Sequence, residues 1–394
     1  MGLVGKKILY VWKSRFPWDI RIDKVCSCLA DTGANTTLLA LHNEEEKERE
    51  NYKNFNIIRK GKGLSGIKTL PVPFNPFWYN AVLESAKEIQ ADLIIVREIM
   101  IAEQSAKAAQ KLGIPVIMDM AENYPALMRL WRKYRTGILN RFLFHFLGVA
   151  EWTEKLSVKL MDGIIVVCEE QIQRLNSTYN FPAEKISVVH NTPPRSFGDY
   201  SHKSKNDKNK IAICHHGYLT DEKKITPFLK SLLLINKHHT KFNFVIAGTG
   251  ESLDELIQIH QSASAPKNII FSGAYDYTSL PEIISNCDFG VLPYEHNDFN
   301  NFTIHNKIFD YFAFGKPVIV SDVHPLKRII EETGAGIVVD FRNIDSAAET
   351  ISQIDTLDYS RMSENAKSAF NNKYNWDYDS QILIDFINKF LNKI

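Results

Sequence analysis

The residues best suited to chemistry gather in the segment 303–310, Thr-Ile-His-Asn-Lys-Ile-Phe-Asp. Apolar residues at helical spacing between 308 and 313 predict a helix that begins near 303–306 and is stopped by Gly315. The backbone N–H groups and the dipole at such a helix start attract anions, and Lys307 adds a formal positive charge. Asp310, one turn further on, can accept hydrogen bonds from the hydroxyls of a ribose. These residue types indicate a nucleoside phosphate site, although each alone is also an ordinary cap or surface residue.

A second glycine pattern, Gly-Lys-Gly-Leu-Ser-Gly at 61–66, has the G-x-G-x-x-G spacing of a dinucleotide-binding turn. That motif requires a helix directly after it. Here Pro71 and Pro73 follow and oppose helix formation. We therefore interpret 61–66 as a flexible loop and do not expect a nicotinamide cofactor.

Composition excludes several classes of protein. The 47 Lys and Arg residues balance 46 Asp and Glu, so no nucleic-acid partner is expected. The five cysteines are odd in number and scattered, which argues against a disulfide framework, and no His, Cys and carboxylate cluster has metal-ligand spacing. No apolar stretch has the length of a membrane span or the form of a signal peptide. We expect a cytoplasmic protein that needs neither metal nor cofactor.

Two series of short, continuous apolar runs must position these residues. Runs of this kind, rich in β-branched residues and separated by helical segments, are typical of parallel strands buried on both faces. In the first half they fall at 7–11, 37–41, 55–58, 93–96, 115–118, 164–167 and 186–189, and in the second at 211–214, 244–247, 269–271, 289–292, 318–320 and 336–339.

The polar segment 199–210, Asp-Tyr-Ser-His-Lys-Ser-Lys-Asn-Asp-Lys-Asn-Lys, separates the two series and is predicted to be a linker. We predict an α/β chain of two doubly wound, Rossmann-like domains, 1–198 and 211–375. A C-terminal helix, 376–394, is expected to pack back toward the first domain. Because ligands of parallel sheets lie beyond the carboxyl ends of the strands, we expect the domains to face each other across a cleft.

Residues 306–319, Asn-Lys-Ile-Phe-Asp-Tyr-Phe-Ala-Phe-Gly-Lys-Pro-Val-Ile, resemble the signature of retaining GT-B glycosyltransferases of family four, which use nucleotide sugars. Five further segments resemble other parts of the family pattern, namely 19–22, 119–125, 215–224, 245–250 and 287–294. The resemblance covers nearly the whole chain. It implies the GT-B fold, a donor site in the second domain and an acceptor site in the first.

The resemblance also implies which residues form the site. The donor is expected at Gly217, Tyr218, Lys223, Gly248, Gly273, Tyr275, His305, Asn306, Lys307 and Asp310. Lys223, the helix start and the Gly217 backbone would stabilise the negative charge on the departing diphosphate, with Glu122 and Glu295 as further catalytic candidates. On the acceptor side the candidates are Arg15, Arg21, Arg97 and Glu122, each of which is otherwise an ordinary ion-pair residue.

Three positions depart from the family pattern. The family commonly has two acidic residues eight apart; Asp310 matches the second, but Phe302 occupies the first. The candidates to replace that donor-sugar contact lie in the loop 295–298, Glu-His-Asn-Asp. Tyr218 stands where the phosphate loop usually has Arg, and Ala121 stands where a His usually precedes the acidic residue. His215 and His216 would compensate in part, unless both are structural.

A stretch between 127 and 160 mixes basic and aromatic residues. It contains seven Lys and Arg residues and only two Glu. The basic residues are Arg129, Arg132, Lys133, Arg135, Arg141, Lys155 and Lys159. Such a mixture favours contact with anionic lipid at the inner face of the cell membrane and suits a lipid-linked acceptor. The alternative is a helical pair that packs on its own domain.

Three functions follow from these observations. The first is a metal-independent glycosyltransferase that moves a sugar from a nucleotide-diphosphate donor to a saccharide or lipid-linked acceptor, with retention, in polysaccharide or cell-envelope glycan synthesis. The second is a GT-B nucleotide-sugar epimerase or phosphorylase, although the residue set that either would need is not recognisable in the sequence. The third is a non-catalytic nucleotide-sugar binder, which Phe302, Tyr218 and Ala121 make credible.

Overall fold

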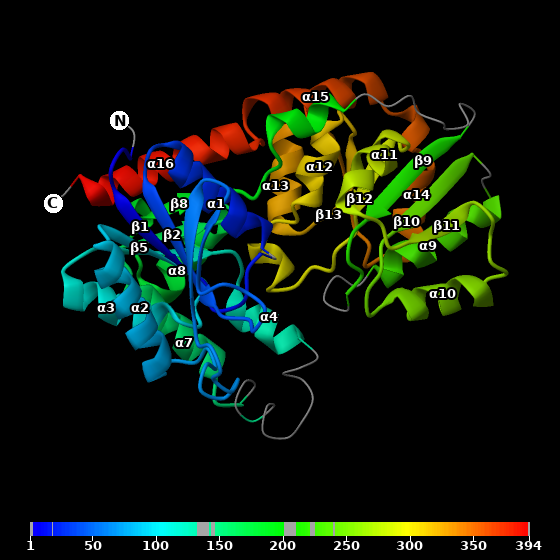
Figure 1. Ribbon diagram of the computed structural model, residues 1–394. Helices are drawn as coiled ribbons and strands as arrows, with labels where there is room; N and C mark the ends of the chain where they lie inside the picture. The colour runs from blue at the N-terminus through cyan, green and yellow to red at the C-terminus, as the bar shows by residue number, and fades with distance from the viewer. Residues whose placement is uncertain are drawn as a thin grey trace. The chain divides into compact units, whose positions relative to one another are not determined.

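The computed structural model describes residues 3–17, 19–131, 142, 146–200, 210–220, 225–238 and 241–392. The chain forms two compact units (Figure 1). One unit consists of Met1–Val189 and Ser380–Ile394, and the other of His190–Asp379. The change of unit thus falls directly after the last strand of the first sheet, ahead of the predicted linker 199–210, most of which lies outside the described residues.

An eight-stranded sheet forms the centre of the first unit, in the order β3-β4-β2-β1-β5-β6-β7-β8. Its strands are β1 (Lys7–Val11), β2 (Asn35–Leu41), β3 (Arg49–Tyr52), β4 (Phe55–Lys60), β5 (Leu93–Arg97), β6 (Val116–Met120), β7 (Gly163–Val166) and β8 (Ile186–Val188). All neighbours are parallel except β3 and β4. The seven predicted strands are confirmed, and β3 is an addition.

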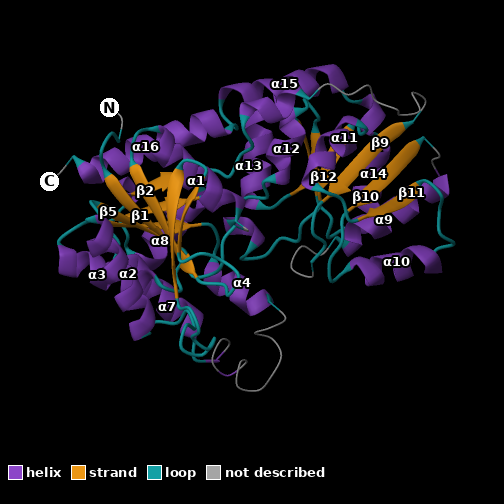
Figure 2. Cartoon of the chain, viewed as in Figure 1, coloured by secondary structure: helices purple, strands orange, loops and turns teal. Residues whose placement is uncertain are grey.

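Helices cover both faces of this sheet (Figure 2). They are α1 (Ile20–Asp31), α2 (Pro76–Ile89), α3 (Ala102–Leu112), α4 (Tyr124–Leu130), α7 (Val149–Lys159) and α8 (Glu170–Tyr179), with a 3₁₀ turn at Ala183–Lys185. The side chains of Asp19, Asn75 and Asn123 cap α1, α2 and α4 by accepting backbone N–H groups. A core that includes Leu9, Trp78 and Ala108 fills the space between the sheet and α2, α3 and α7.

A six-stranded, wholly parallel sheet forms the second unit, in the order β11-β10-β9-β12-β13-β14. Its strands are β9 (Ile211–His216), β10 (Phe242–Ala247), β11 (Ile269–Gly273), β12 (Phe289–Leu292), β13 (Val318–Ser321) and β14 (Gly336–Val339). The helices are α9 (Thr226–His238), α10 (Leu253–Ser262), α11 (Leu280–Ser285), α12 (Lys307–Ala313), α13 (His324–Thr333), α14 (Ile344–Ser352) and α15 (Tyr359–Asn372), with 3₁₀ turns at Arg195–Asp199, Tyr277–Ser279, Asn300–Phe302 and Ile354–Thr356. The six predicted strands are all present.

The last helix, α16 (Trp376–Leu391), belongs to both units. In its first turn, the buried Asp379 accepts hydrogen bonds from the backbone N–H of His190 and from the Thr192 hydroxyl, both in the second unit. From Ser380 onward the helix is part of the first unit. There, a Cβ added at Gly163 would come within 2.5 Å of Phe390 Cζ, so a glycine permits this close packing on β7. Within the described ranges, no helix is long and apolar enough to cross a membrane.

Candidate active site

Three glycine turns meet at the carboxyl edge of the second sheet, after β9, β10 and β11. The Gly217 N–H donates to Ala247 O at 2.8 Å, and the Gly248 N–H donates to Gly273 O at 2.8 Å. A Cβ on Gly248 would lie 1.9 Å from the Gly217 carbonyl oxygen, so only glycine allows this approach. The Gly217 N–H is thus used within the turn, and its part in stabilising a diphosphate stays a prediction.

Lys307 lies against the same turn. Gly217 has a φ of +110°, and a Cβ there would be 2.2 Å from Lys307 Cε and 2.8 Å from Lys307 Nζ. The Lys307 ammonium donates to Tyr294 Oη at 3.1 Å and lies 5.7 Å from the centre of the Tyr294 ring. The helix α12 begins at Lys307, one residue beyond the predicted range 303–306. The missing Cβ of Gly217 therefore makes room for a cation at the start of α12.

Asp310 belongs to a row of polar groups beside these turns. His216 Nδ1 is 3.1 Å from Tyr275 Oη, and His216 Nε2 is 3.8 Å from Asp310 Oδ2. Burial lowers the pKa of His216 well below its usual value, and the charge of Lys307 lowers it further. Burial, with the charge of Asp310, raises the pKa of Tyr275 above its usual value and that of Tyr277 to about 12. At neutral pH the imidazole is thus neutral and both phenols keep their protons, which, beside Asp310, suits hydrogen bonding to hydroxyl groups.

His305 and Asn306 precede α12 and differ in what they offer. His305 Nε2 lies 3.0 Å from Asn300 Oδ1, and its ring centre is 3.8 Å from that of Tyr294. These contacts tie the residues before α12 to the loop that follows β12. The side-chain oxygen of Asn306 is buried and has no hydrogen-bond partner among the described residues. Asn306 can therefore accept a hydrogen bond from a bound ligand.

The loop 295–302 follows β12 and borders a pocket of about 190 Å³. Asn297 Oδ1 accepts the backbone N–H groups of Phe299 and Asn300, at 3.0 and 2.8 Å, so this side chain is used to form the loop. The pocket is lined by Pro227, Pro293, Tyr294, Glu295, His296, Ser321, Asp322, Asp340, Phe341, Arg342 and Ile344. Four residues, 295–298, are the candidates to replace the acidic residue that is missing at position 302. Of these four, Glu295 and His296 line the pocket.

The remaining donor residues are placed less tightly. Tyr218 is 54% exposed. Gly273 has a φ of +73°, and a Cβ added there would have no described atom within 4 Å. Lys223 lies outside the described residues. Within the described part of the chain, no group of three or more His, Cys, Asp or Glu side chains could hold a metal ion.

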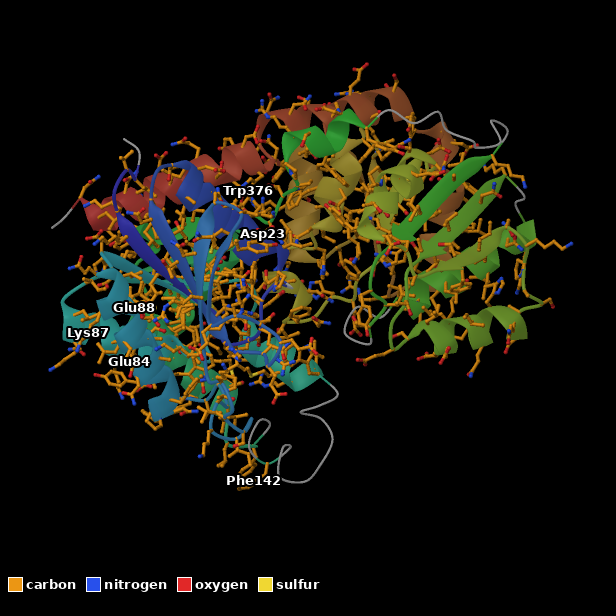
Figure 3. The ribbon with its side chains drawn as sticks, viewed as in Figure 1. Asp23, Glu84, Lys87, Glu88, Phe142 and Trp376 are labelled. Carbon is orange, nitrogen blue, oxygen red and sulfur yellow. The ribbon has the colours of Figure 1, made fainter. Side chains whose placement is uncertain are left out.

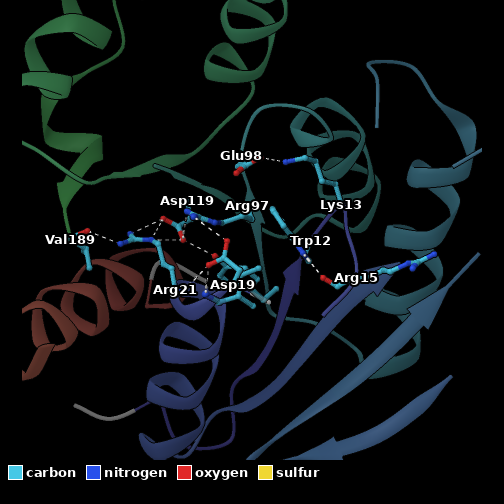
Figure 4. Close-up of polar contacts among 11 residues, drawn as sticks. Trp12, Lys13, Arg15, Asp19, Arg21, Arg97, Glu98, Asp119 and Val189 are labelled. Carbon is cyan, nitrogen blue, oxygen red and sulfur yellow. Dashed lines mark hydrogen bonds and ion pairs between the residues drawn. The ribbon is translucent and has the colours of Figure 1, made fainter. Parts of the chain in front are cut away.

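In the first unit a buried carboxylate, Asp119 at the end of β6, gathers the basic residues (Figure 4). Asp119 accepts from Arg21 Nη2 at 2.8 Å and from Tyr10 Oη at 2.6 Å, and Arg97 Nη1 lies 3.5 Å away. Burial alone would raise the pKa of Asp119, but Arg21 and Arg97 outweigh it, so the pKa lies below its usual value. The carboxylate is therefore charged and balanced by two guanidinium groups.

The predicted acceptor-side arginines separate into three roles. Arg21 is buried and also donates to Val189 O at 3.0 Å, so it ties α1 to the end of β8. Arg97 is 6% exposed, and its Nε has no hydrogen-bond partner among the described residues. Arg15 is exposed and points away from the Asp119 cluster (Figure 4). The structure thus brings Arg21 and Arg97 together and leaves Arg15 apart.

Two residues near Arg97 were not among the predicted site residues. Glu98 directly follows β5, has a φ of +69° and pairs with Lys13. A non-glycine residue in this left-handed region is strained, which is common at functional sites. Tyr124 is buried, and its hydroxyl has no partner among the described residues. Burial is the largest cause that raises the pKa of Tyr124. The charge of Glu98 raises it further, and Glu122 makes a smaller contribution. Their positions just after strands were the signal available in the sequence.

Two Rossmann-like units, each with its polar residues at the carboxyl edge of a parallel sheet, define the GT-B class of fold. Known proteins share it. Sucrose-phosphate synthase from Thermosynechococcus elongatus matches with a TM-score of 0.74 and 12% identity, over 99% of this chain and 100% of that one. Anabaena HepE in complex with UDP matches with a TM-score of 0.67 and 13% identity, over 98% of this chain and 100% of that one. A further structure of HepE holds UDP-glucose.

Family comparison is more specific. Residues 20–192 match Glycosyltransferase Family 4, and residues 197–369 match Glycosyl transferases group 1. The chain belongs to the family-four GT-B glycosyltransferases. An uncharacterized glycosyltransferase of Methanocaldococcus jannaschii is 27% identical over 238 residues, which are 57% of this chain and 59% of that protein. The matched region thus spans less than two thirds of this curated relative.

Proposed function

We propose that this chain transfers a sugar from a nucleoside-diphosphate donor to a saccharide or lipid-linked acceptor, with retention of configuration, in cell-envelope or other polysaccharide synthesis at the inner face of the membrane. The family to which the chain belongs supports a nucleotide-sugar donor. HepE, with the same fold, has been solved with UDP and UDP-glucose, which makes uridine diphosphate sugars the first donors to test.

The pairing of Lys307 with Gly217 carries this proposal. A cation held beside a turn at the carboxyl edge of the sheet is placed to balance a diphosphate, and Asp310 lies one helical turn away. When the sugar–phosphate bond breaks, negative charge builds up on the leaving diphosphate, and a fixed cation lowers the energy of that state. Lys223, a candidate from the sequence that lies outside the described residues, would supply a second positive charge. Asp310 and Asn306 would accept hydrogen bonds from ribose or sugar hydroxyls.

On the acceptor side, we infer that Arg97 and Tyr124 meet the incoming molecule. Both are buried hydrogen-bond donors that lack a partner among the described residues, for Arg97 at Nε and for Tyr124 at Oη. Leaving a buried donor unsatisfied is unfavourable, so each gains from an acceptor oxygen. Glu122, close enough to raise the pKa of Tyr124, is the nearby candidate to accept a proton, or a hydrogen bond, from a hydroxyl group.

Nucleotide release from a panel of sugar nucleotides tests the donor half of the proposal. The whole chain would be incubated with uridine, guanosine, adenosine and thymidine diphosphate sugars, and free nucleoside diphosphate would be measured with water as acceptor. We expect one class to be hydrolysed, and Asp310→Ala and Lys223→Ala to slow release. Unchanged turnover in both variants would show that the site is wrong.

A non-catalytic nucleotide-sugar binder is the second candidate, because Phe302 replaces an acidic residue and Tyr218 an arginine of the family pattern. The same panel separates the two functions. Saturable binding of a sugar nucleotide without any release of nucleotide, with or without added saccharide acceptors, would favour the binder.

A further inference from the structure

Two features of the sequence have no assigned role in the sites described above. One is the basic and aromatic stretch 127–160, of which four basic residues lie outside the described residues, namely Arg132, Lys133, Arg135 and Arg141. The other is the histidine pair at the end of β9. His215 and His216 are both buried. Because successive side chains of a strand point to opposite faces, we expect the two histidines to differ in role.

His215 is held between two strands of the sheet. Its Nδ1 lies 2.9 Å from the carbonyl oxygen of Val291 in β12, and its ring centre is 6.1 Å from that of Tyr294. These contacts join β9 to β12, so we assign His215 a structural role. His216 instead faces α12, where its ring centre lies 5.1 Å from that of Tyr311. The side chains that project from β9 and α12 are drawn as sticks in Figure 3.

Two tyrosines hold the His216 ring in place. A Cβ on Gly290 would be 2.4 Å from the Tyr311 ring, so the glycine in β12 leaves the space that this ring occupies. The Tyr311 hydroxyl donates to the carbonyl oxygen of Cys214 at 2.6 Å, two residues before His216. The Tyr275 hydroxyl lies 3.1 Å from Nδ1 of His216. The imidazole is therefore positioned before a ligand binds, as a selective site requires.

The His216 imidazole directs an N–H donor toward Asp310. Burial, and then the charge of Lys307, lower the pKa of His216, so the ring is neutral at pH 7 and has one N–H donor and one acceptor. Nε2 lies 3.8 Å from Asp310 Oδ2, and the charge of Asp310 favours the tautomer that carries the proton on Nε2. Nδ1 then accepts the hydroxyl of Tyr275. Nε2 is buried and has no hydrogen-bond partner among the described residues.

The gap between Nε2 of His216 and Oδ2 of Asp310 fits one hydroxyl oxygen. At 3.8 Å the two atoms are too far apart for a direct hydrogen bond, yet an oxygen can lie at about 2.8 Å from both. A hydroxyl accepts from the Nε2–H and donates to Asp310, whereas a carbonyl oxygen or a C–H group cannot do both. The Asp310 side chain is 16% exposed and that of His216 only 3%, so a ligand reaches the gap past Asp310.

The surroundings of this gap favour a ribose hydroxyl on the side of the base. Lys307, proposed to balance the diphosphate, precedes Asp310 by three residues, about 4.5 Å along the helix axis. Tyr275 and Tyr277 follow β11, at the edge of the sheet, and the charge of Asp310 acts on both. Aromatic rings stack on nucleobases of any kind. Because C2′ of a ribose adjoins the carbon that carries the base, the 2′-hydroxyl is the one expected in the gap.

We propose that His216 makes this protein selective for ribonucleoside diphosphates over 2′-deoxyribonucleoside diphosphates. Nε2 of His216 would donate to the 2′-hydroxyl, which would in turn donate to Asp310. A 2′-deoxyribose places a C–H group there and leaves the buried N–H without an acceptor, which is unfavourable. This inference rests on the proposed donor site and narrows its substrates: uridine, guanosine and adenosine diphosphate sugars fit, and thymidine diphosphate sugars, which lack the 2′-hydroxyl, do not.

Calorimetric titration of the whole protein tests this selectivity. UDP, GDP and ADP are each compared with their 2′-deoxy form, so that the preferred base need not be known in advance. We expect loss of the 2′-hydroxyl to raise the Kd roughly 10- to 100-fold, because it removes a hydrogen bond to a charged group and leaves a buried donor unsatisfied. The 3′-deoxy form of UDP should lose less affinity than the 2′-deoxy form.

Substitutions of His216 assign the effect to its Nε2–H. His216→Phe keeps an aromatic ring beside Tyr311 and removes the donor, so the ratio of the 2′-deoxy Kd to the ribo Kd should fall by about fivefold or more. His216→Gln has an amide N–H group that can donate in its place, and it should retain more of the ratio. His260→Phe is the matched control in the same unit: its Nε2 lies 3.1 Å from the carbonyl oxygen of Pro266 on α10's far side from the gap, and the ratio should be unchanged.

Two results would overturn the inference about His216. One is a Kd that agrees within about twofold between the ribo and 2′-deoxy forms of every pair, and the other is a ratio that His216→Phe leaves unchanged. If His216→Phe does not fold, the wild-type pairs and His216→Gln still decide. Equal release of nucleotide from thymidine and uridine diphosphate sugars would also refute the selectivity while leaving the proposed sugar transfer intact. If no nucleoside diphosphate binds in any form, the proposed donor site fails, and the selectivity with it.

Discussion

Replacing Gly217 by alanine should weaken nucleotide binding through Lys307. All three atoms nearest to the added Cβ belong to Lys307, at 2.2 Å for Cε, 2.8 Å for Nζ and 3.6 Å for Cδ. A separation of 2.2 Å is far inside van der Waals contact, so the lysine side chain must leave its place. In Lys307→Ala these three atoms are absent, and the alanine at 217 has no lysine to displace.

The magnitude follows from the charge that is lost. A cation about 4 Å from a phosphate contributes about 4 kcal/mol at an effective dielectric constant of 20. Lys307 is partly exposed, and hydrogen bonds to charged groups contribute about 1.5–3 kcal/mol, so we take about 2 kcal/mol. That corresponds to a roughly 30-fold rise in Kd. If Gly217→Ala acts only by displacing Lys307, both single variants should show this rise, and the double variant should be no worse than Lys307→Ala.

Calorimetric titration with UDP of the wild type, the two single variants and the double variant measures the coupling. Gly113→Ala is the control: Gly113 also has a left-handed φ, of +68°, but nothing lies within 4 Å of an added Cβ. It should lower thermal stability by the backbone strain alone and leave the Kd unchanged. Additive losses, with a Kd raised roughly a thousandfold in the double variant, would refute the idea that Gly217 acts through Lys307.

Three further substitutions have definite expected results. Asp310→Asn should raise the Kd for UDP by roughly tenfold or more without lowering the unfolding midpoint, because it weakens a hydrogen bond to a charged acceptor; calorimetry and thermal denaturation measure the two quantities. Asp119→Asn should cost about 3 kcal/mol or more at pH 7, because it removes the carboxylate that pairs with the buried Arg21 and leaves the buried Arg97 with Asp19. Since the folded pKa of Asp119 is lowered, its contribution is present above the unfolded pKa of about 4 and is lost as pH falls through the folded value, so urea titrations of the two proteins should converge in acid and diverge toward pH 7. Gly163→Ala should destabilise the first unit by about 1–3 kcal/mol through the 2.5 Å approach to Phe390, whereas Gly66→Ala, with nothing within 4 Å, should not.

The sequence predicted the strands well because burial on both faces leaves a direct trace in composition. Each of the thirteen predicted runs is a strand, and β1, β12 and β14 have the predicted bounds. The edge strand β3 was missed because Arg-Glu-Asn-Tyr, at 49–52, is polar and pairs antiparallel on the exposed margin. Local hydrophobicity cannot indicate β3, because this segment is a strand only through its pairing with β4.

The site was predictable in its residue types but not in its contacts. Lys307 and Asp310 stood out because a helix start with a cation and a carboxylate is a local pattern. The contact between Gly217 and Lys307 joins two distant segments and depends on a backbone angle that the sequence does not state. Asp119 likewise gathers Tyr10 and Arg21, which are 109 and 98 residues away. Only the folded sheet, which aligns the ends of β1 and β6, brings these groups together.

The two units use buried charge in different ways, and the difference bears on recognition. In the first unit, Asp119 and Asp19 together offset Arg21 and Arg97, so the cluster presents N–H groups rather than net charge. In the second unit, Lys307 donates to the Tyr294 hydroxyl oxygen, and Asp310 faces an imidazole kept neutral by burial. The first arrangement suits an acceptor recognised by hydrogen bonds and shape, and the second suits a charged diphosphate. Donor binding should accordingly weaken with ionic strength more steeply than acceptor binding, because a diphosphate is recognised through its charge, which salt screens.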